Sequence, residues 1–235
     1  MLVSLIIKKI ASPITAIIPT NTKIRSLTYN EGVIKVDFSK ELMNTIPENE
    51  EKIIEAIVYT LTSIDEVEFI IIYMDGNILT NLPQSKKTLP STLDRSFGIN
   101  KEYNLNSTKD INKTTIYYIS EFNNNKYYVP VTKVTNDTRN KIEIIVDELS
   151  SNNLYKTNLM SYLNSNTKLL SVNETEEELV VNFNSCIFND INTEEILEEV
   201  IYTISMSIND NYDINTVVFN VENKEISTFS SKTID

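Results

Sequence analysis

Hydrophobic and polar positions follow a pattern that occurs twice along the chain. Residues 166–169 and 181–184 match residues 21–24 and 36–39 at a constant offset of 145 positions. The apolar stripe of residues 196–204 matches that of residues 53–61 at an offset of 143. Solenoid repeats are roughly 20–50 residues long, so a period of this length indicates a duplicated domain.

The first copy is expected to contain two helices and three strands. Residues 53–61 carry apolar side chains at helical spacing after Pro47, which predicts an amphipathic helix. Gly32 supplies the backbone freedom needed by a turn between two alternating runs. In chain order we expect a helix at 3–11, strands at 23–28 and 33–38, a helix at 48–61, and a strand at 67–74 that ends in the turn pair Asp75-Gly76.

The second copy is more complete, because a β-hairpin precedes the shared elements. In chain order we expect hairpin strands at 115–120 and 126–134 around a turn at 123–125, a helix at 140–150, strands at 169–173 and 178–184, a helix opened by residues 192–195, and a last strand at 216–221. Asn192 and Glu195 are expected to cap the second helix reciprocally. The residues after Ile226 are polar, so we expect a frayed tail.

The expected fold class is therefore α+β, with two tandem copies of a small sheet packed by two helices. The first copy lacks the N-terminal strands of the second, and we interpret this as an N-terminal truncation. Apolar residues such as Leu89, Leu93 and Phe97 predict that the connection between the copies packs partly on a domain. The expected boundaries are 1–78 for the first domain, 79–113 for the connection, 114–228 for the second domain and 229–235 for the tail.

The net charge and the counts of His and Cys argue against several classes of function. The net charge is −12 and Lys and Arg are not clustered, which disfavours nucleic acid and direct adsorption to an anionic membrane. The chain has no His and one Cys, so a Ser-His-Asp triad, a Cys-His dyad and an intramolecular disulfide cannot form. We find no phosphate loop or metal-ligand spacing. We therefore expect no catalytic residue, no cofactor and no metal.

The N-terminal run of residues 1–10 is apolar but is interrupted by Lys8 and Lys9. It is too short to span a bilayer, which needs about 20 apolar residues. It also lacks the order of regions that a signal peptide has. From the sequence as given, the chain is expected to be soluble and untargeted.

Asp37 is the most prominent polar candidate, and Asn182 occupies its position in the second copy. A catalytic acid would have been lost from one copy, whereas a strand-end hydrogen bond is open to Asp and Asn alike. Ser39 is likewise replaced by Asn184. We expect packing to be preserved in both copies and polar chemistry in only one, as in a scaffold.

Two further sets of residues have a structural and a functional interpretation. Tyr117, Tyr118, Tyr127 and Tyr128 are expected to face one another across the hairpin and stabilise it. The alternative is that exposed tyrosines anchor an interface with another molecule. The acidic residues at 65–68 and 174–178 are expected to be solvated loop faces, with a basic partner or a weak cation site as the alternative.

The order of the motifs resembles the GerM domain of sporulation and spore germination. Residues 18–24, 33–39, 59–62 and 67–76 carry the pattern in the first copy, and residues 115–226 carry a weaker version. The motif positions, which we expect to be structural, are Asp37, Phe38, Ser39, Gly76, Asn182 and Phe183. The domain is also similar to the ring-building motif of secretion-system rings.

This resemblance implies a non-catalytic, extracytoplasmic envelope protein of endospore-forming bacteria. It implies protein partners in the membrane complex that joins mother cell and forespore, and a homo-oligomer or ring. Membrane attachment would come only through a lipid anchor upstream of this sequence, because the chain shows no signal peptide or lipobox. The alternative function is a module that binds peptidoglycan through the tyrosine-rich hairpin.

Overall fold

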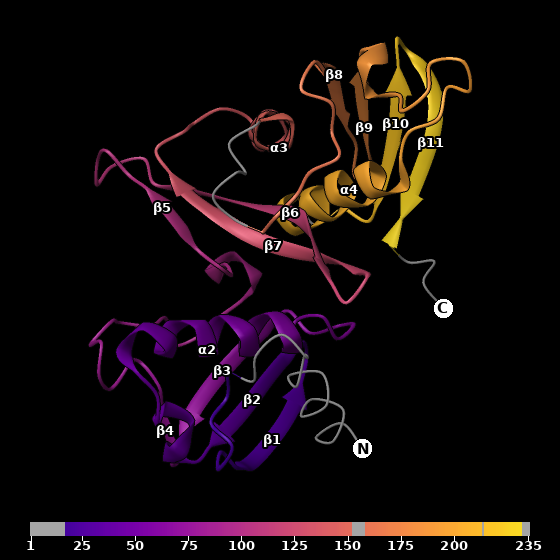
Figure 1. Cartoon of the computed structure of the whole chain (residues 1–235). Helices are drawn as coiled ribbons and strands as arrows, with labels where there is room; N and C mark the ends of the chain where they lie inside the picture. Colours follow the sequence, from indigo (N-terminus) through magenta and orange to yellow (C-terminus); the bar gives the residue numbers. More distant parts are fainter. Residues whose placement is uncertain (1–16, 152–157, 213, 232–235) are drawn as a thin grey trace. The chain divides into compact units, whose positions relative to one another are not determined.

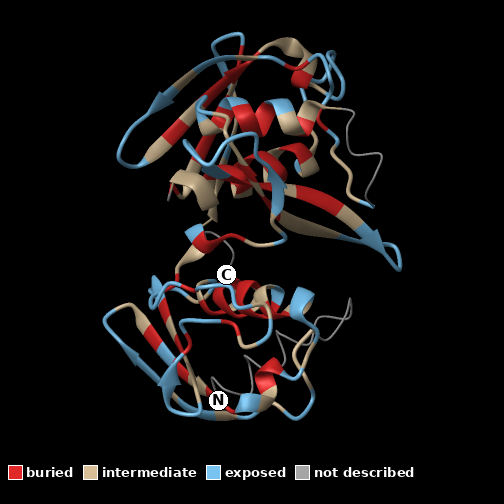
Figure 2. Ribbon diagram, turned by 90° about the vertical axis from the view of Figure 1, so that its left-hand side faces the viewer, coloured by how far each residue is buried: buried red, intermediate tan, exposed pale blue. Residues whose placement is uncertain are grey.

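The computed structural model describes residues 17–151, 158–212 and 214–231. The chain divides into two compact units, residues 1–100 and 101–235 (Figure 1). The division falls inside the segment 79–113 that the sequence suggested as a connection. Buried residues gather inside each unit, whereas exposed ones lie on turns, on hairpin tips and on the outer sides of strands and helices (Figure 2). The predicted helix at 3–11 lies outside the described residues.

In the described residues of the first unit, one long helix packs on a four-stranded sheet. Its elements are β1 (Ile24–Asn30), β2 (Val33–Phe38), α2 (Pro47–Leu61), β3 (Phe69–Met74) and β4 (Asn77–Ile78), in sheet order β1-β2-β3-β4. β2 and β3 are parallel and α2 connects them, whereas the other pairs are antiparallel. The apolar stripe of α2 packs on one face of the sheet to form the core. The predicted strands and helix are thus confirmed.

Residues 79–100 complete this unit after the last strand. Leu93 exchanges two backbone hydrogen bonds with Ile70 of β3, at 2.7 and 2.8 Å, and so lengthens the short edge made by β4. The predicted partial packing is confirmed, because the segment contributes five buried side chains: Leu79, Leu82, Leu89, Leu93 and Phe97.

Two buried glutamates of α2 hold this segment in place. The Glu50 carboxylate is 0% exposed and accepts hydrogen bonds from the backbone N–H groups of Gln84 and Ser85, at 2.9 and 2.7 Å. Glu55 accepts one from the N–H of Asn100 at 2.9 Å. A buried carboxylate is tolerated when such donors replace its water, so these bonds explain two charges on a buried helix face.

The described part of the second unit contains two sheets and two α-helices. Its elements are β5 (Glu102–Asn104), β6 (Asn112–Phe122), β7 (Asn125–Thr135), α3 (Lys141–Ser150), β8 (Leu169–Glu174), β9 (Glu178–Phe183), α4 (Glu198–Tyr212), β10 (Thr216–Val221) and β11 (Lys224–Ser230). The sheet orders are β5-β7-β6 and β11-β10-β9-β8. α4 packs against β6 and also against β10 and β11, so it is shared by both sheets (Figure 1).

Side chains of α4 take the place of a neighbouring strand along β6. Ser207 Oγ accepts from the N–H of Tyr117 at 2.9 Å. Asn211 accepts from the N–H of Thr115 at 3.2 Å and donates to its carbonyl at 2.7 Å. The hairpin is therefore closed along this part of its edge, where an unpaired strand would invite pairing with another chain.

Three expectations for the second unit are wrong. The capping box is absent: α4 begins at Glu198, and Asn192 instead donates to Asp190 Oδ1 through its backbone N–H and its amide, at 2.8 and 3.0 Å. This local turn competes with helix formation. The expected fraying is wrong for residues 227–230, because they belong to β11, which pairs with β10, and its half-buried Ile226 and Phe229 pack on the core.

The third error concerns the hairpin register. Tyr117 and Tyr118 lie opposite Pro130 and Val129, and Tyr127 and Tyr128 lie opposite Ser120 and Ile119. The turn holds two residues, Asn123 and Asn124, with φ of 51° and 61°, and two-residue hairpin loops favour positive φ at both positions. We expected the turn to span residues 123–125 and the tyrosines to face one another, but neither turn length pairs them, because Tyr117 and Tyr118 lie too far from the turn to reach Tyr127 and Tyr128 in register.

Candidate functional site

The motif residues of the first copy meet at the ends of β2 and β3. Asp37 Oδ1 accepts a hydrogen bond from the N–H of Gly76 at 3.1 Å, across the β3–β4 turn. Both residues of this turn have positive φ, 48° at Asp75 and 81° at Gly76. Glycine adopts such a φ without strain. Arg25 lies on the solvent side, where it pairs with Asp75 and has its Nε 3.7 Å from Asp37 Oδ2.

The second copy builds the same contact with an amide. Asn182 Oδ1 accepts from the N–H of Asn223 at 3.0 Å, across the β10–β11 turn, and its Nδ2 donates to Asn223 Oδ1 at 2.9 Å. Glu222 and Asn223 have φ of 50° and 68°, like the turn of the first copy. The role therefore needs an acceptor oxygen and no charge, which confirms the strand-end hydrogen bond that we expected for both residues.

A second pair of motif residues behaves in the same way. Ser39 Oγ accepts from the N–H of Lys23 at 3.0 Å, and Asn184 Oδ1 accepts from the N–H of Lys168 at 2.9 Å. Each side chain satisfies a backbone donor at the start of the edge strand. The expectation that polar chemistry is preserved in only one copy is wrong at these positions, because different residues make equivalent bonds.

The remaining motif residues contribute to packing or to the turn. Phe38 and Phe183 are buried in the two cores, and Phe183 stacks on Phe219 with ring centroids 6.3 Å apart. Gly76 has no heavy atom within 4 Å of where a Cβ would lie, so its positive φ and not crowding favours glycine there.

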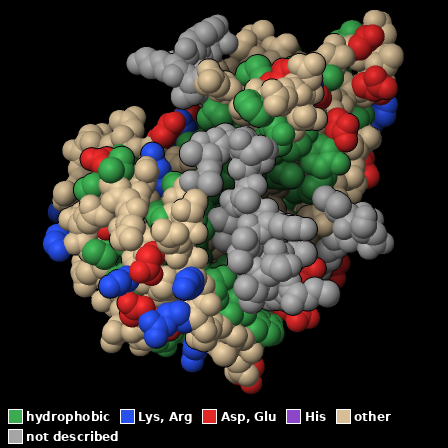
Figure 3. Space-filling view, turned by 60° about the horizontal axis from the view of Figure 1, so that its bottom comes forward, with side chains coloured by type: hydrophobic (Ala, Val, Ile, Leu, Met, Phe, Trp, Pro, Cys, Tyr) green, Lys and Arg blue, Asp and Glu red, His purple; other side chains and the backbone are tan. Residues whose placement is uncertain are grey.

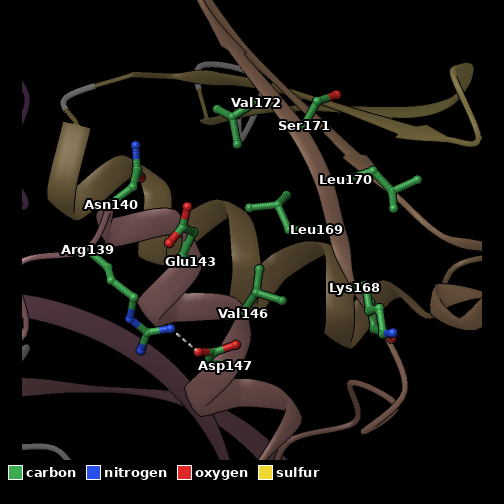
Figure 4. A pocket seen from close by; sticks show the side chains of 11 residues that line it. Arg139, Asn140, Glu143, Val146, Asp147, Lys168, Leu169, Leu170, Ser171 and Val172 are labelled. Atoms are coloured by element: carbon green, nitrogen blue, oxygen red, sulfur yellow. Dashed lines mark hydrogen bonds and ion pairs between the residues drawn. The ribbon is translucent and has the colours of Figure 1, made fainter.

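A hollow of about 490 Å³ lies between α3 and β8 of the second unit (Figure 4). Arg139 lines it and pairs with Asp147 and with Asp137, where Nη2 is 2.8 Å from Oδ2. Hydrogen bonds from Arg139 lower the pKa of Asp137. Asp137 and Arg139 thereby stay charged, which suits a structural ion pair rather than proton transfer near neutral pH.

Three of the four hairpin tyrosines make contacts inside the second unit. The Tyr118 hydroxyl donates to Glu148 at 3.2 Å and that of Tyr117 to Asp210 at 3.0 Å, whereas Tyr128 packs on Tyr202 with centroids 5.5 Å apart. The pKa of Tyr118 is raised, mainly because the hydroxyl is buried and to a smaller extent because Glu148 is negatively charged. Tyr127 is partly exposed. The tyrosines thus do not form one flat exposed platform.

The described residues contain no group of three or more His, Cys, Asp or Glu side chains that could hold a metal ion. Among the same residues, no helix is long and apolar enough to cross a membrane. On the face drawn in Figure 3, Lys and Arg side chains are interspersed with Asp and Glu. Residues 1–100 contain 10 basic and 12 acidic residues, whereas residues 101–235 contain 11 and 21, so the second unit carries most of the negative charge.

Comparison with known proteins agrees with this architecture. The family described as Germane, sporulation and spore germination, matches residues 1–80 and 115–227, which is most of the chain. The chain belongs to the Germane family. The two matched ranges correspond to the two copies of the repeat.

A characterised relative and a solved structure give the same result. The spore germination protein GerM of Bacillus subtilis (strain 168) is 28% identical over 214 residues, which cover 89% of this chain and 58% of that protein. The chain therefore spans somewhat more than half of that relative. The tandem GerMN domains of the sporulation protein GerM from Bacillus subtilis superpose with a TM-score of 0.82 at 26% identity, covering 93% of this chain and 77% of the other. The α+β tandem fold expected from the sequence is confirmed.

Proposed function

We propose that this chain is a non-catalytic scaffold of sporulation that acts through protein contacts on the surfaces of its two units. One observation carries this proposal. The polar motif residues Asp37, Ser39, Asn182 and Asn184 all accept hydrogen bonds from backbone N–H groups. The motif therefore serves the fold, and recognition is left to exposed residues outside it.

An acid–base mechanism receives no support from the motif positions. A general base has to accept a proton from a substrate, and it needs a titratable group for this. Asn182 cannot titrate in the accessible pH range, yet it occupies the place of Asp37 and makes the same contact. A reaction that depends on Asp37 would leave the second copy without a role.

The place of action that fits this role is the boundary between mother cell and forespore. We propose that the chain works outside the cytoplasm, is held near the membrane by a lipid anchor, and assembles with itself or with partners of a membrane complex. Membership of a sporulation and germination family supports this assignment. The peptidoglycan alternative gains no support, because Tyr117, Tyr118 and Tyr128 are engaged within the second unit.

Deletion of the gene in its own organism tests the role in sporulation. We expect the number of heat-resistant spores to fall and to be restored by the wild-type gene and by an Asp37→Asn gene. Normal spore counts after deletion would contradict the proposal. Normal complementation by wild type but none by Asp37→Asn, with equal protein levels, would instead indicate chemistry at Asp37.

Light scattering during size-exclusion chromatography tests self-assembly separately. We expect the mass of the purified chain to rise with concentration if heterologous contacts link successive copies. A mass that stays at one chain, alone and with native membrane partners, would remove the ring from the proposal and keep the scaffold.

A further inference from the structure

The outward face of the first sheet carries an apolar row that the core does not use. Successive residues of a strand point to opposite faces, and the inward set, including Ile34 and Ile72, is buried under α2. The outward set is partly or largely exposed, with Phe69 at 38% and Ile78 at 43%. The row consists of Val33, Phe69, Ile71, Tyr73 and Ile78, which are neighbours in the strand register.

The second copy shows that the fold does not need these side chains. Its sheet has the same order and the same parallel and antiparallel pairs. In register, the row of the first copy corresponds to Glu178, Thr216, Val218, Asn220 and Glu225. Only Val218 is apolar among them, and it is buried. An exposed apolar row in one copy and a polar row in the other is typical of an interaction surface rather than of folding.

Acidic residues border one end of the row, where β2 and β3 begin. Glu31, Asp65, Glu66 and Glu68 are all exposed there. None of these four forms an ion pair with another described residue. Lys35 is the one basic residue of the row's strands, and it lies beside Ile71 in the register. Unpaired carboxylates at the rim of an apolar surface favour a partner that presents Lys or Arg at that position.

We propose that the apolar row of the first sheet docks a protein segment that has an apolar side followed by Lys or Arg residues. Phe69 and Tyr73 would be its principal anchors, because aromatic side chains contribute large contact areas at interfaces. The inference rests on the proposed scaffold function and assigns one of its contact surfaces. The second sheet lacks this surface, so the two copies differ in the partners that they bind.

Site-specific photocross-linking in sporulating cells of the encoding organism tests this surface. The probe is benzoylphenylalanine, introduced at Lys35, which adjoins the row without being one of its apolar members. The matched control has the probe at Val180, the equivalent position of the second copy. We expect adducts at position 35 well above those at position 180. Mass spectrometry should place them on a partner segment with apolar residues next to at least two Lys or Arg residues.

A double variant then tests the anchors. Phe69→Thr with Tyr73→Asn installs the residues that the second copy has at these positions, and it should lower the adduct yield at position 35 about tenfold or more. Circular dichroism checks that the variant is folded, and Phe69→Thr alone replaces it if it is not, with a severalfold loss expected.

Four outcomes would overturn the inference: no adducts above the Val180 control, adducts on a second copy of this chain, a cross-linked segment without basic residues, or a yield unchanged by the variants. Spore counts of the deletion strain separate the two proposals. A sporulation defect without specific adducts at position 35 removes only this surface. Normal spore counts in the deletion strain would contradict the proposed scaffold function, with or without adducts at position 35.

Discussion

The two units end the same sheet in different ways. In the second unit, β11 is a continuous seven-residue strand that pairs along β10. In the first unit, β4 has two residues, and Leu93 returns from a long segment to cover the next part of β3. The segment is held by the buried carboxylate of Glu50, which β11 does not require. The two copies of the sheet therefore keep the same central strands, whereas different segments of the chain cover the edge in each copy.

Removing β11 should have the largest effect, because the second unit has no substitute for it. A chain that ends at Asn223 loses Ile226 and Phe229, which pack on the core, and exposes the edge of β10. We expect a loss of about 5 kcal/mol or more, comparable to the whole stability of a small domain. Hydrogen exchange should show protection lost in residues 114–221 and kept in the first unit. A chain that ends at Ser231 keeps β11 and is the control; equal protection in both chains would contradict the importance of this strand.

Glu50→Ala should have the next largest effect, confined to the first unit. It leaves the N–H groups of Gln84 and Ser85, whose hydrogen bonds are partly buried, without their acceptor, at a cost of about 2–4 kcal/mol. Hydrogen exchange in residues 79–100 should accelerate, while residues 101–231 stay unchanged. Glu51→Ala is the matched control, since it removes a carboxylate that pairs with Lys87 at the surface and should cost less than about 1 kcal/mol. Equal effects of the two variants would refute the role of Glu50.

Acidification should loosen the same contact. Burial raises the pKa of Glu50, but hydrogen bonds from Ser85 and Gln84 outweigh it and hold the pKa below its ordinary value of 4.5. A depressed pKa contributes stability above 4.5, and this is lost as the pH falls below that value through the pKa of the folded state. We expect exchange in residues 79–100 to rise with acid in the wild type and to depend less on pH in Glu50→Gln. Parallel profiles would exclude this carboxylate as the cause.

The strand-end acceptors should show a smaller effect that differs between the copies. Asn182 is buried, so Asn182→Ala should cost about 1–3 kcal/mol by leaving the N–H of Asn223 unpaired. Asp37 is half-buried and its turn is exposed, so Asp37→Ala should cost about 1 kcal/mol. Asp37→Asn keeps the acceptor and should cost less than about 0.5 kcal/mol. Urea unfolding followed by probes in each unit measures all three, and a reversed order would mean that charge matters more than the acceptor.

Most of the regular elements could be predicted from the sequence, because the helix stripe of residues 53–61 and the alternation in β2 and β9 reflect local periodicity. The strand-end role of Asp37 and Asn182 followed from comparing the copies. The start of α4 could not be predicted, since the Asp190 side chain competes for the backbone at Asn192. β11 was not predicted, because the polar side chains of its solvated face make its sequence resemble a polar tail. The burial of Glu50 could not be predicted either, because it depends on the contact with Gln84 and Ser85, which are distant in sequence.

The interchange of oxygen acceptors at the strand ends also bears on how the two halves diverged. A carboxylate, a hydroxyl and an amide each supply the acceptor that a backbone N–H needs, and the copies use all three across Asp37, Ser39, Asn182 and Asn184. Mutations among these residue types were therefore close to neutral for folding, and lineages could drift at the motif while retaining the hairpin geometry. Older duplicates of this domain would then be recognisable by where acceptors recur, even after residue identity between their strands has disappeared.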